Sequence, residues 1–148
     1  MSECIDASVA VKWFKKEEEY ADKAMIVYEK IRDFKIQAVM SEWIGLEIVR
    51  ALMKSNYSKE KINDAFFVIH DLFSIGIIEK ILVSDIILLA KNIEIDLKLY
   101  AADSVHLASA IYSNSKILWT EDKHLLNERV KKYVSKYNLE LKKLVELK

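Results

Sequence analysis

The sequence contains no proline, two glycines (Gly45 and Gly76) and a single cysteine, Cys4. Because glycine and proline mark most turns and linkers, their scarcity excludes a long flexible linker and favours a chain dominated by helices. One cysteine cannot form a disulfide within the chain, which favours an intracellular setting, and we expect a cytoplasmic protein. With 148 residues, of which 52% are hydrophobic, the chain is predicted to form one domain over residues 1–148.

An excess of one charge and long apolar runs are also missing. The 23 basic residues balance the 23 acidic ones, so no global positive field attracts nucleic acid, although a local basic groove is compatible with this balance. No segment approaches the ~18 apolar residues of a membrane span, and we expect no membrane association. The nucleotide-binding patterns GxxxxGK[ST] and GxGxxG are absent, and the three histidines lack the spacing of a zinc site.

Short apolar runs and helically spaced apolar residues alternate along the whole chain. The runs predict a first strand at the start of "SECIDASVAVKWF", in the short apolar run that ends at Asp6, and further strands in "KIQAVMS", "IIEKILV", "KILWT" and "LELKKLVEL". Helices are predicted near Ser8, over about Glu17 to Arg32, after Ser41, after Ser58, after Ser84 with Asp85, over about Ala101 to Ser113, and from about Lys123, with the serines at 41, 58 and 84 as N-caps. Strands separated by helices require right-handed crossovers. The predicted fold is therefore a helix-rich, three-layer α/β/α sandwich with a mainly parallel central sheet.

Four carboxylates occupy positions that otherwise look structural. Asp6 ends the first predicted strand and Asp122 closes "KILWTED", and ligands of such sheets bind beyond the carboxyl ends of the strands. Glu47 shares the apolar stripe of its helix, and Asp103 stands in the first turn of a helix whose next residues are small or apolar. These positions predict that the four acids meet at one edge of the sheet.

Each acid also has a simpler explanation. Asp6 and Asp122 could cap the helices that follow them, Asp103 is favoured by the helix dipole, and Glu47 could reach solvent or pair with Arg50. As a group, however, four clustered carboxylates repel one another, and one takes up a proton unless a cation neutralises them. Oxygen-only ligands suit Mg²⁺ or Mn²⁺.

The segments "CIDASVAV", "LEIVRAL", "LYAADSVHLASAI" and "ILWTEDKHL" resemble, in order and approximate spacing, the four acidic motifs of PIN-domain nucleases, with most similarity to the VapC-type toxins. The match extends from Cys4 to about Leu125. The resemblance implies a PIN-like fold in which Ser8 and Thr120 support the acids. It also implies a metal-binding, catalytic quartet composed of Asp6, Glu47, Asp103 and Asp122. Arg50 departs from the asparagine that many relatives carry there.

What the resemblance implies is a Mg²⁺- or Mn²⁺-dependent endoribonuclease that cleaves single-stranded RNA, is neutralised by a small VapB-like antitoxin and forms a homodimer. In this interpretation Asp6, Asp103 and Asp122 mainly bind the ion, and Glu47 positions or deprotonates the attacking water. One alternative is a catalytically inactive PIN-like module that binds RNA or protein. The other is a different α/β metal-dependent phosphoesterase, although the DxDx[TV] signature is missing after Asp6.

Other conspicuous side chains are predicted to be structural. His106 is expected in the core or an interface rather than among metal ligands, and Trp13, Trp43 and Trp119 are expected in the core. The tail beyond Asp122 has many more lysines than acids. A solvated helix face explains this excess better than a track for a phosphate backbone.

Overall fold

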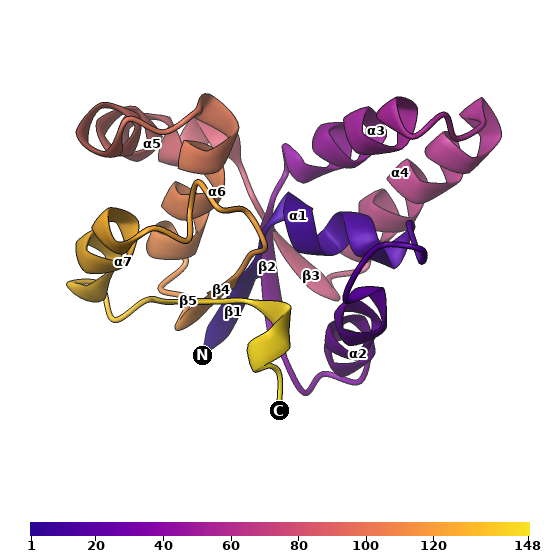
Figure 1. The fold of residues 1–148 in the computed structure, drawn as a ribbon, viewed down its shortest axis with the longest axis horizontal. Helices are drawn as coiled ribbons and strands as arrows, with labels where there is room; N and C mark the ends of the chain where they lie inside the picture. The colour runs from indigo at the N-terminus through magenta and orange to yellow at the C-terminus, as the bar shows by residue number, and fades with distance from the viewer.

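The computed structural model describes residues 1–148 and contains one five-stranded sheet in which every strand pair is parallel (Figure 1). The strands are β1 (Ser2–Ile5), β2 (Gln37–Ser41), β3 (Ile78–Ile81), β4 (Ile117–Trp119) and β5 (Glu140–Lys142). Their order across the sheet is β3-β2-β1-β4-β5, so β1 lies at the centre. The predicted parallel sheet is confirmed.

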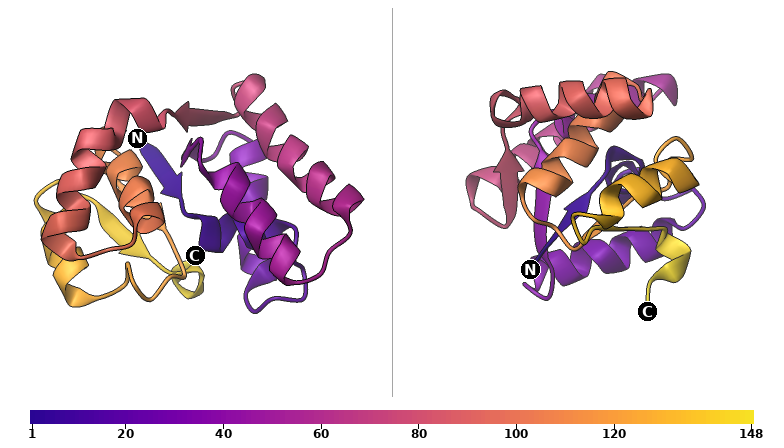
Figure 2. Two further views of the ribbon diagram at one scale, coloured as in Figure 1. Left: turned by 90° about the horizontal axis from the view of Figure 1, so that it is seen from above. Right: turned by 90° about the vertical axis from the view of Figure 1, so that its left-hand side faces the viewer.

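Helices cover both faces of the sheet, as the alternating pattern predicted. One layer contains α1 (Ala7–Ala10), the 3-10 turn η1 (Val11–Trp13), α2 (Ala21–Arg32), α3 (Ile44–Lys54) and α4 (Lys59–Ser74), and the other contains α5 (Val83–Leu97), α6 (Ala101–Tyr112) and α7 (Glu128–Ser135). Figure 2 shows the two groups on opposite sides of the strands. The chain ends with η2 (Leu144–Glu146). This is the predicted three-layer sandwich. None of the helices is both long enough and apolar enough to cross a membrane.

Two separate hydrophobic cores hold these layers together. Neighbouring strand residues point to opposite faces of a sheet, so a central strand is apolar on both sides. In β1, Cys4 belongs to the core beneath α5, α6 and α7, while Ile5 belongs to the core beneath the other helices. In β2, Val39 and Met40 divide in the same way. This explains the continuous apolar runs that predicted the strands.

The predicted N-caps were right at one helix and wrong at two. Ser58 caps α4, because its side chain accepts a hydrogen bond from the backbone N–H of Lys61. Ser41 instead ends β2, and its hydroxyl accepts a hydrogen bond from Trp43 before α3 begins. Trp43 is 46% exposed, so its predicted place in the core was wrong, whereas the other two tryptophans are buried.

The prediction that Ser84 and Asp85 cap their helix was wrong for a tertiary reason. α5 begins earlier, at Val83, whose backbone N–H donates to Oε2 of Glu42 at 2.6 Å. The first N–H groups of a helix have no partner within the helix. Here a carboxylate that lies 41 residues away in sequence supplies the acceptor.

Three other boundaries differ from the predicted ones. α2 begins after Tyr20, which has a left-handed conformation (φ 62°), rather than at Glu17. α7 begins at Glu128 with Asn127 as its cap, rather than near Lys123. The closing strand is only three residues long because the chain turns into η2.

Candidate active site

The candidate site lies where the carboxyl ends of β1 and β4 meet. The chain forms β1, β2 and β3 towards one side of the sheet, then crosses to the other side for β4 and β5. Ligands of open α/β sheets bind at this kind of switch point. Asp6 follows β1 and Thr120 follows β4. Glu47 lies on α3, and Asp103 and His106 lie on α6.

Asp6 is buried and held by hydroxyl groups. Its Oδ2 accepts hydrogen bonds from Ser8 Oγ at 2.6 Å and from Thr120 Oγ1 at 2.9 Å. The same oxygen accepts the Ser8 backbone N–H at 3.3 Å, so Asp6 is also the N-cap of α1, as the simpler explanation proposed. Capping therefore accounts for only one of the three hydrogen bonds, and the other two fix the orientation of the carboxylate.

The two hydroxyls also hold the segment that carries Asp122. The backbone N–H of Glu121 donates to Ser8 Oγ at 2.8 Å, and that of Asp122 donates to Thr120 Oγ1 at 3.0 Å. The ends of two neighbouring strands are thereby joined through side chains. These hydrogen bonds, together with the pairing of β1 with β4, set the relative positions of Asp6 and Asp122.

Glu47 pairs with His106 rather than with Arg50. Nε2 of His106 lies 2.5 Å from Oε1 of Glu47 and 3.6 Å from Oδ1 of Asp6. Burial lowers the pKa of His106, but the charge of Asp6, the hydrogen bond and charge of Glu47, and the charge of Asp103 together raise this pKa to about 9. His106 is therefore a cation at neutral pH, buried between two carboxylates.

The burial of His106 was predicted correctly, but its contact with the acids was missed. A signal was present in the sequence, because residues three apart on a helix share a face. Once Asp103 is assigned to the site, His106 follows on the same side of α6. Nδ1 of His106 is buried without a hydrogen-bond partner.

Asp103 and Asp122 form a second linked pair. Burial, the hydrogen bond with Asp122 and the charges of Asp122 and Asp6 together raise the pKa of Asp103 to about 7, although the charge of His106 opposes this rise. Oδ1 of Asp122 accepts the backbone N–H of His124 at 2.8 Å, in a turn that precedes α7. Neither acid caps a helix by a side-chain hydrogen bond. The N-cap of α7 is Asn127, and the N-cap residue of α6, Tyr100, makes no side-chain capping hydrogen bond.

The donor set fits a divalent cation in chemistry and charge. His106 is the only basic side chain that forms an ion pair with any of these acids, so negative charge remains on the cluster. A hard cation that binds carboxylate oxygens would relieve the repulsion from Asp122 and Asp6 that helps to raise the pKa of Asp103. The side chains do not yet converge, since no three His, Cys, Asp or Glu residues surround a common metal position.

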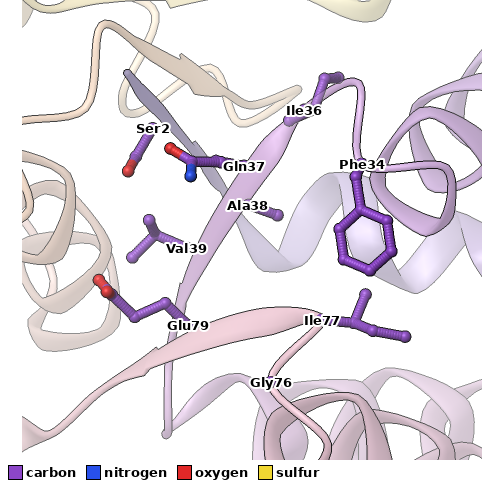
Figure 3. A pocket seen from close by; sticks show the side chains of 9 residues that line it. All are labelled: Ser2, Phe34, Ile36, Gln37, Ala38, Val39, Gly76, Ile77 and Glu79. Carbon is purple, nitrogen blue, oxygen red and sulfur yellow. The ribbon is translucent and has the colours of Figure 1, made fainter.

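The opposite edge of the sheet has a different character. A cavity of about 330 Å³ lies at the amino ends of β1, β2 and β3 (Figure 3). It is lined by Ser2, Phe34, Ile36, Gln37, Ala38, Val39, Gly76, Ile77 and Glu79. With one carboxylate and no basic group, this lining offers no counterpart to the acidic cluster.

Comparison with known proteins agrees with the fold and with the sequence motifs. The structure resembles VapBC2 from Rickettsia felis, which was solved bound to a DNA fragment from its promoter. The sequence identity is 17% and the TM-score is 0.65, and the match covers 97% of this chain and 98% of the other. It also resembles a toxin–antitoxin complex from Klebsiella pneumoniae, with 16% identity, a TM-score of 0.59, and 86% and 92% covered. No curated protein gave a significant sequence match. The PIN domain model matches residues 4–131, most of the chain, and the chain therefore belongs to the PIN domain family.

Proposed function

We propose that this protein is a Mg²⁺- or Mn²⁺-dependent endoribonuclease that cleaves single-stranded RNA. The observation that carries this proposal is that Asp6, Glu47, Asp103 and Asp122 lie close enough at one edge of the sheet to interact with one another or with His106. Clustered carboxylates are costly unless a cation compensates them. A cluster of this kind serves a protein best where a metal ion and a phosphate must be held together.

In the proposed mechanism, Asp6, Asp103 and Asp122 hold the ion. When bound, the ion would lower the pKa of a water and stabilise negative charge on the phosphate. Ser8 and Thr120 donate hydrogen bonds to one oxygen of Asp6 and leave the other oxygen free of hydroxyl partners. They therefore act as positioning residues that fix the carboxylate, whose other oxygen, Oδ1, lies 3.6 Å from Nε2 of His106.

Glu47 is proposed to orient or deprotonate the attacking water. Oε1 of Glu47 is occupied by His106, whereas Oε2 forms no hydrogen bond within the protein and the side chain is 22% exposed. One oxygen is thus anchored and the other is open to a water molecule. General bases must lie within hydrogen-bond reach of the proton they accept, and the anchoring limits how far Glu47 can swing.

We further propose a cytoplasmic toxin that pairs with a small VapB-like antitoxin. Both solved structures described above are toxin–antitoxin complexes, and these complexes share the fold of this chain. Large apolar side chains remain exposed on the helices and offer surface to a partner. On α4 and α5 they include Phe67, Val68, Ile87, Leu88 and Ile95.

A homodimer is part of the same proposal. The apolar residues of α4 are divided in the structure, because Ala65, Ile69 and Leu72 are buried in the core while Phe67 is 56% exposed. The exposed part could pack against a second copy or against the antitoxin. Sedimentation velocity of the protein alone tests whether this surface pairs with a second copy, because a dimer that forms without antitoxin requires self-association.

The test is digestion of a labelled single-stranded RNA with Mn²⁺ by the wild type, Asp6→Asn and Asp85→Asn. Asp85 is an exposed acid in the first turn of α5, so its substitution removes the same charge outside the site. We expect Asp6→Asn to lower cleavage at least ~100-fold and Asp85→Asn to match the wild type. Equal cleavage by all three proteins would contradict the proposal. Hydrolysis of a phosphomonoester instead of RNA would favour the phosphoesterase alternative, and RNA binding without cleavage would favour the inactive module.

A further inference from the structure

A second hollow, with basic groups, is lined in part by the two sequence neighbours of Asp122. It has a volume of about 310 Å³ and is lined by Tyr20, Glu121, Lys123, Leu126, Lys143 and Val145. Two of these residues flank Asp122 in sequence. The backbone N–H of Glu121 donates to Ser8 Oγ, which itself donates to Asp6, so one wall of the hollow is fixed to the network of the acidic site.

The charges in this hollow favour an anion. Lys123 and Lys143 are exposed, and neither ammonium group lies within 4.0 Å of a carboxylate. Glu121 is the only acid in the lining, and its carboxylate accepts the backbone N–H of Leu144 at 2.9 Å. That carboxylate is engaged in holding the tail against the loop after β4, while the two lysines keep their charge available to a ligand.

An aromatic ring completes the hollow. Tyr20 is half-buried at the start of α2, its left-handed backbone is set by the turn before the helix, and its hydroxyl has no hydrogen-bond partner in the protein. Leu126 and Val145 add apolar surface. Sequence-tolerant binding of single strands combines lysines along the backbone with aromatic rings on which bases stack. The volume lies at the lower end of the ~300–1,000 Å³ of small-ligand pockets, a size that suits one nucleotide.

We infer that this hollow is a nucleotide subsite, in which Lys123 and Lys143 bind phosphate and Tyr20 stacks on a base of single-stranded RNA next to the bond cleaved at the acidic cluster. The inference rests on the proposed function of the acidic site. It also answers an electrostatic requirement of that function, because a polyanion that approaches clustered carboxylates must be held by basic groups beside them.

The test measures binding separately from cleavage. Fluorescence anisotropy with a labelled single-stranded RNA, in EDTA and at low salt, compares the wild type with Lys123→Gln/Lys143→Gln. The control, Lys80→Gln/Lys91→Gln, removes the same charge from β3, at the far edge of the sheet from β5, and from the exposed face of α5. We expect about tenfold weaker binding for the first variant only. Its slope of log K against log salt should be smaller by ~0.7 for each phosphate that the substituted lysines no longer neutralise.

The aromatic contact has its own pair of variants. Tyr20→Phe keeps the ring, whereas Tyr20→Leu keeps apolar packing but removes stacking, so we expect roughly fivefold or greater loss of binding for leucine alone. Equal binding by both lysine variants, an unchanged salt slope, full binding by Tyr20→Leu, or no RNA binding by the wild type would each overturn the subsite.

Cleavage in Mn²⁺ separates this inference from the proposed function. The lysine variant in the hollow should show a raised KM and a retained kcat. Specific RNA binding in the hollow by a wild type that never cleaves would contradict the ribonuclease and leave the subsite standing. Cleavage that is equally efficient in both lysine variants would remove the subsite and leave the ribonuclease standing.

Discussion

The amino and carboxyl ends of the strands in one sheet form two edges that differ in chemistry. At the carboxyl edge, Asp6 and Asp103 stand at the start of α1 and in the first turn of α6, where the helix dipole favours negative charge. At the amino edge, α2 and α4 end near the cavity of Figure 3, and the carbonyl ends of helices disfavour acids. The direction of the helices thus favours the buried carboxylates at the carboxyl edge.

Acids at the two edges also differ in burial. Glu79, at the amino edge, is exposed and solvated. Asp6 and Asp103 are buried, and the pKa of Asp103 is raised to about 7. Substitutions that remove an acid should therefore have large effects at the carboxyl edge and small effects at the amino edge.

The largest expected difference is in turnover. Glu47→Gln keeps the shape of the side chain but removes its ability to accept a proton, and we expect a loss of ~10²–10⁴-fold in kcat with Mn²⁺ affinity changed much less. Glu79→Gln should retain full activity. Single-turnover cleavage of labelled RNA measures both, and unchanged turnover in Glu47→Gln would remove the role assigned to Glu47.

Loss of the buried, positively charged His106 side chain should reduce stability. His106→Leu leaves Glu47 and Asp6 without their partner, and we expect a loss of about 3 kcal/mol in the free energy of unfolding near pH 6. The exposed His70 on α4 is the control, and His70→Leu should change stability by less than ~0.5 kcal/mol. Urea denaturation measures both variants.

The effect of His106 should depend on pH in a defined direction. Its folded-state pKa of about 9 exceeds the unfolded value of ~6.5, so its stabilisation is complete below pH ~6.5 and is lost as the pH rises through about 9. The difference between wild type and His106→Leu should shrink over this range. A constant difference between pH 6 and 9.5 would show that His106 acts through packing rather than charge.

Removal of a repelling acid should stabilise the metal-free protein. The folded-state pKa of Asp103 is raised to about 7, so the wild type loses stability as the pH rises from ~4 to about 7, and Asp103→Asn should not. In EDTA at pH 8 we expect the variant to be about 1 kcal/mol more stable. Added Mn²⁺ should raise the melting temperature of the wild type more than that of the variant, and the opposite order would argue against Asp103 as a ligand.

The smallest effect is expected at the amino edge. Gly76 has φ +80°, and a Cβ there would meet no atom within 4 Å, so Gly76→Ala suffers from backbone strain alone. We expect about 1 kcal/mol lower stability with RNA cleavage unchanged, and a smaller loss for Gly76→Asn, since asparagine tolerates this conformation. A loss of activity in either variant would show that the two edges are coupled.

Local sequence patterns determined most of the architecture. Apolar runs and helical spacing predicted the five strands, the helices between them, the parallel sheet and its two covered faces. They also placed Asp6 and Asp122 after buried strands, because the burial of a strand is encoded within a few neighbouring residues. The absence of glycine and proline linkers was similarly readable.

Only the tertiary structure decided how the side chains pair. His106 pairs with Glu47 across 59 residues, and Glu42 starts α5 from 41 residues away. The position of Lys143 beside Lys123 likewise depends on where the tail folds back. Such contacts depend on the relative placement of whole helices and strands, and the packing of two cores sets this placement. Short-range periodicity records which face of an element is buried, but not which distant residue it meets.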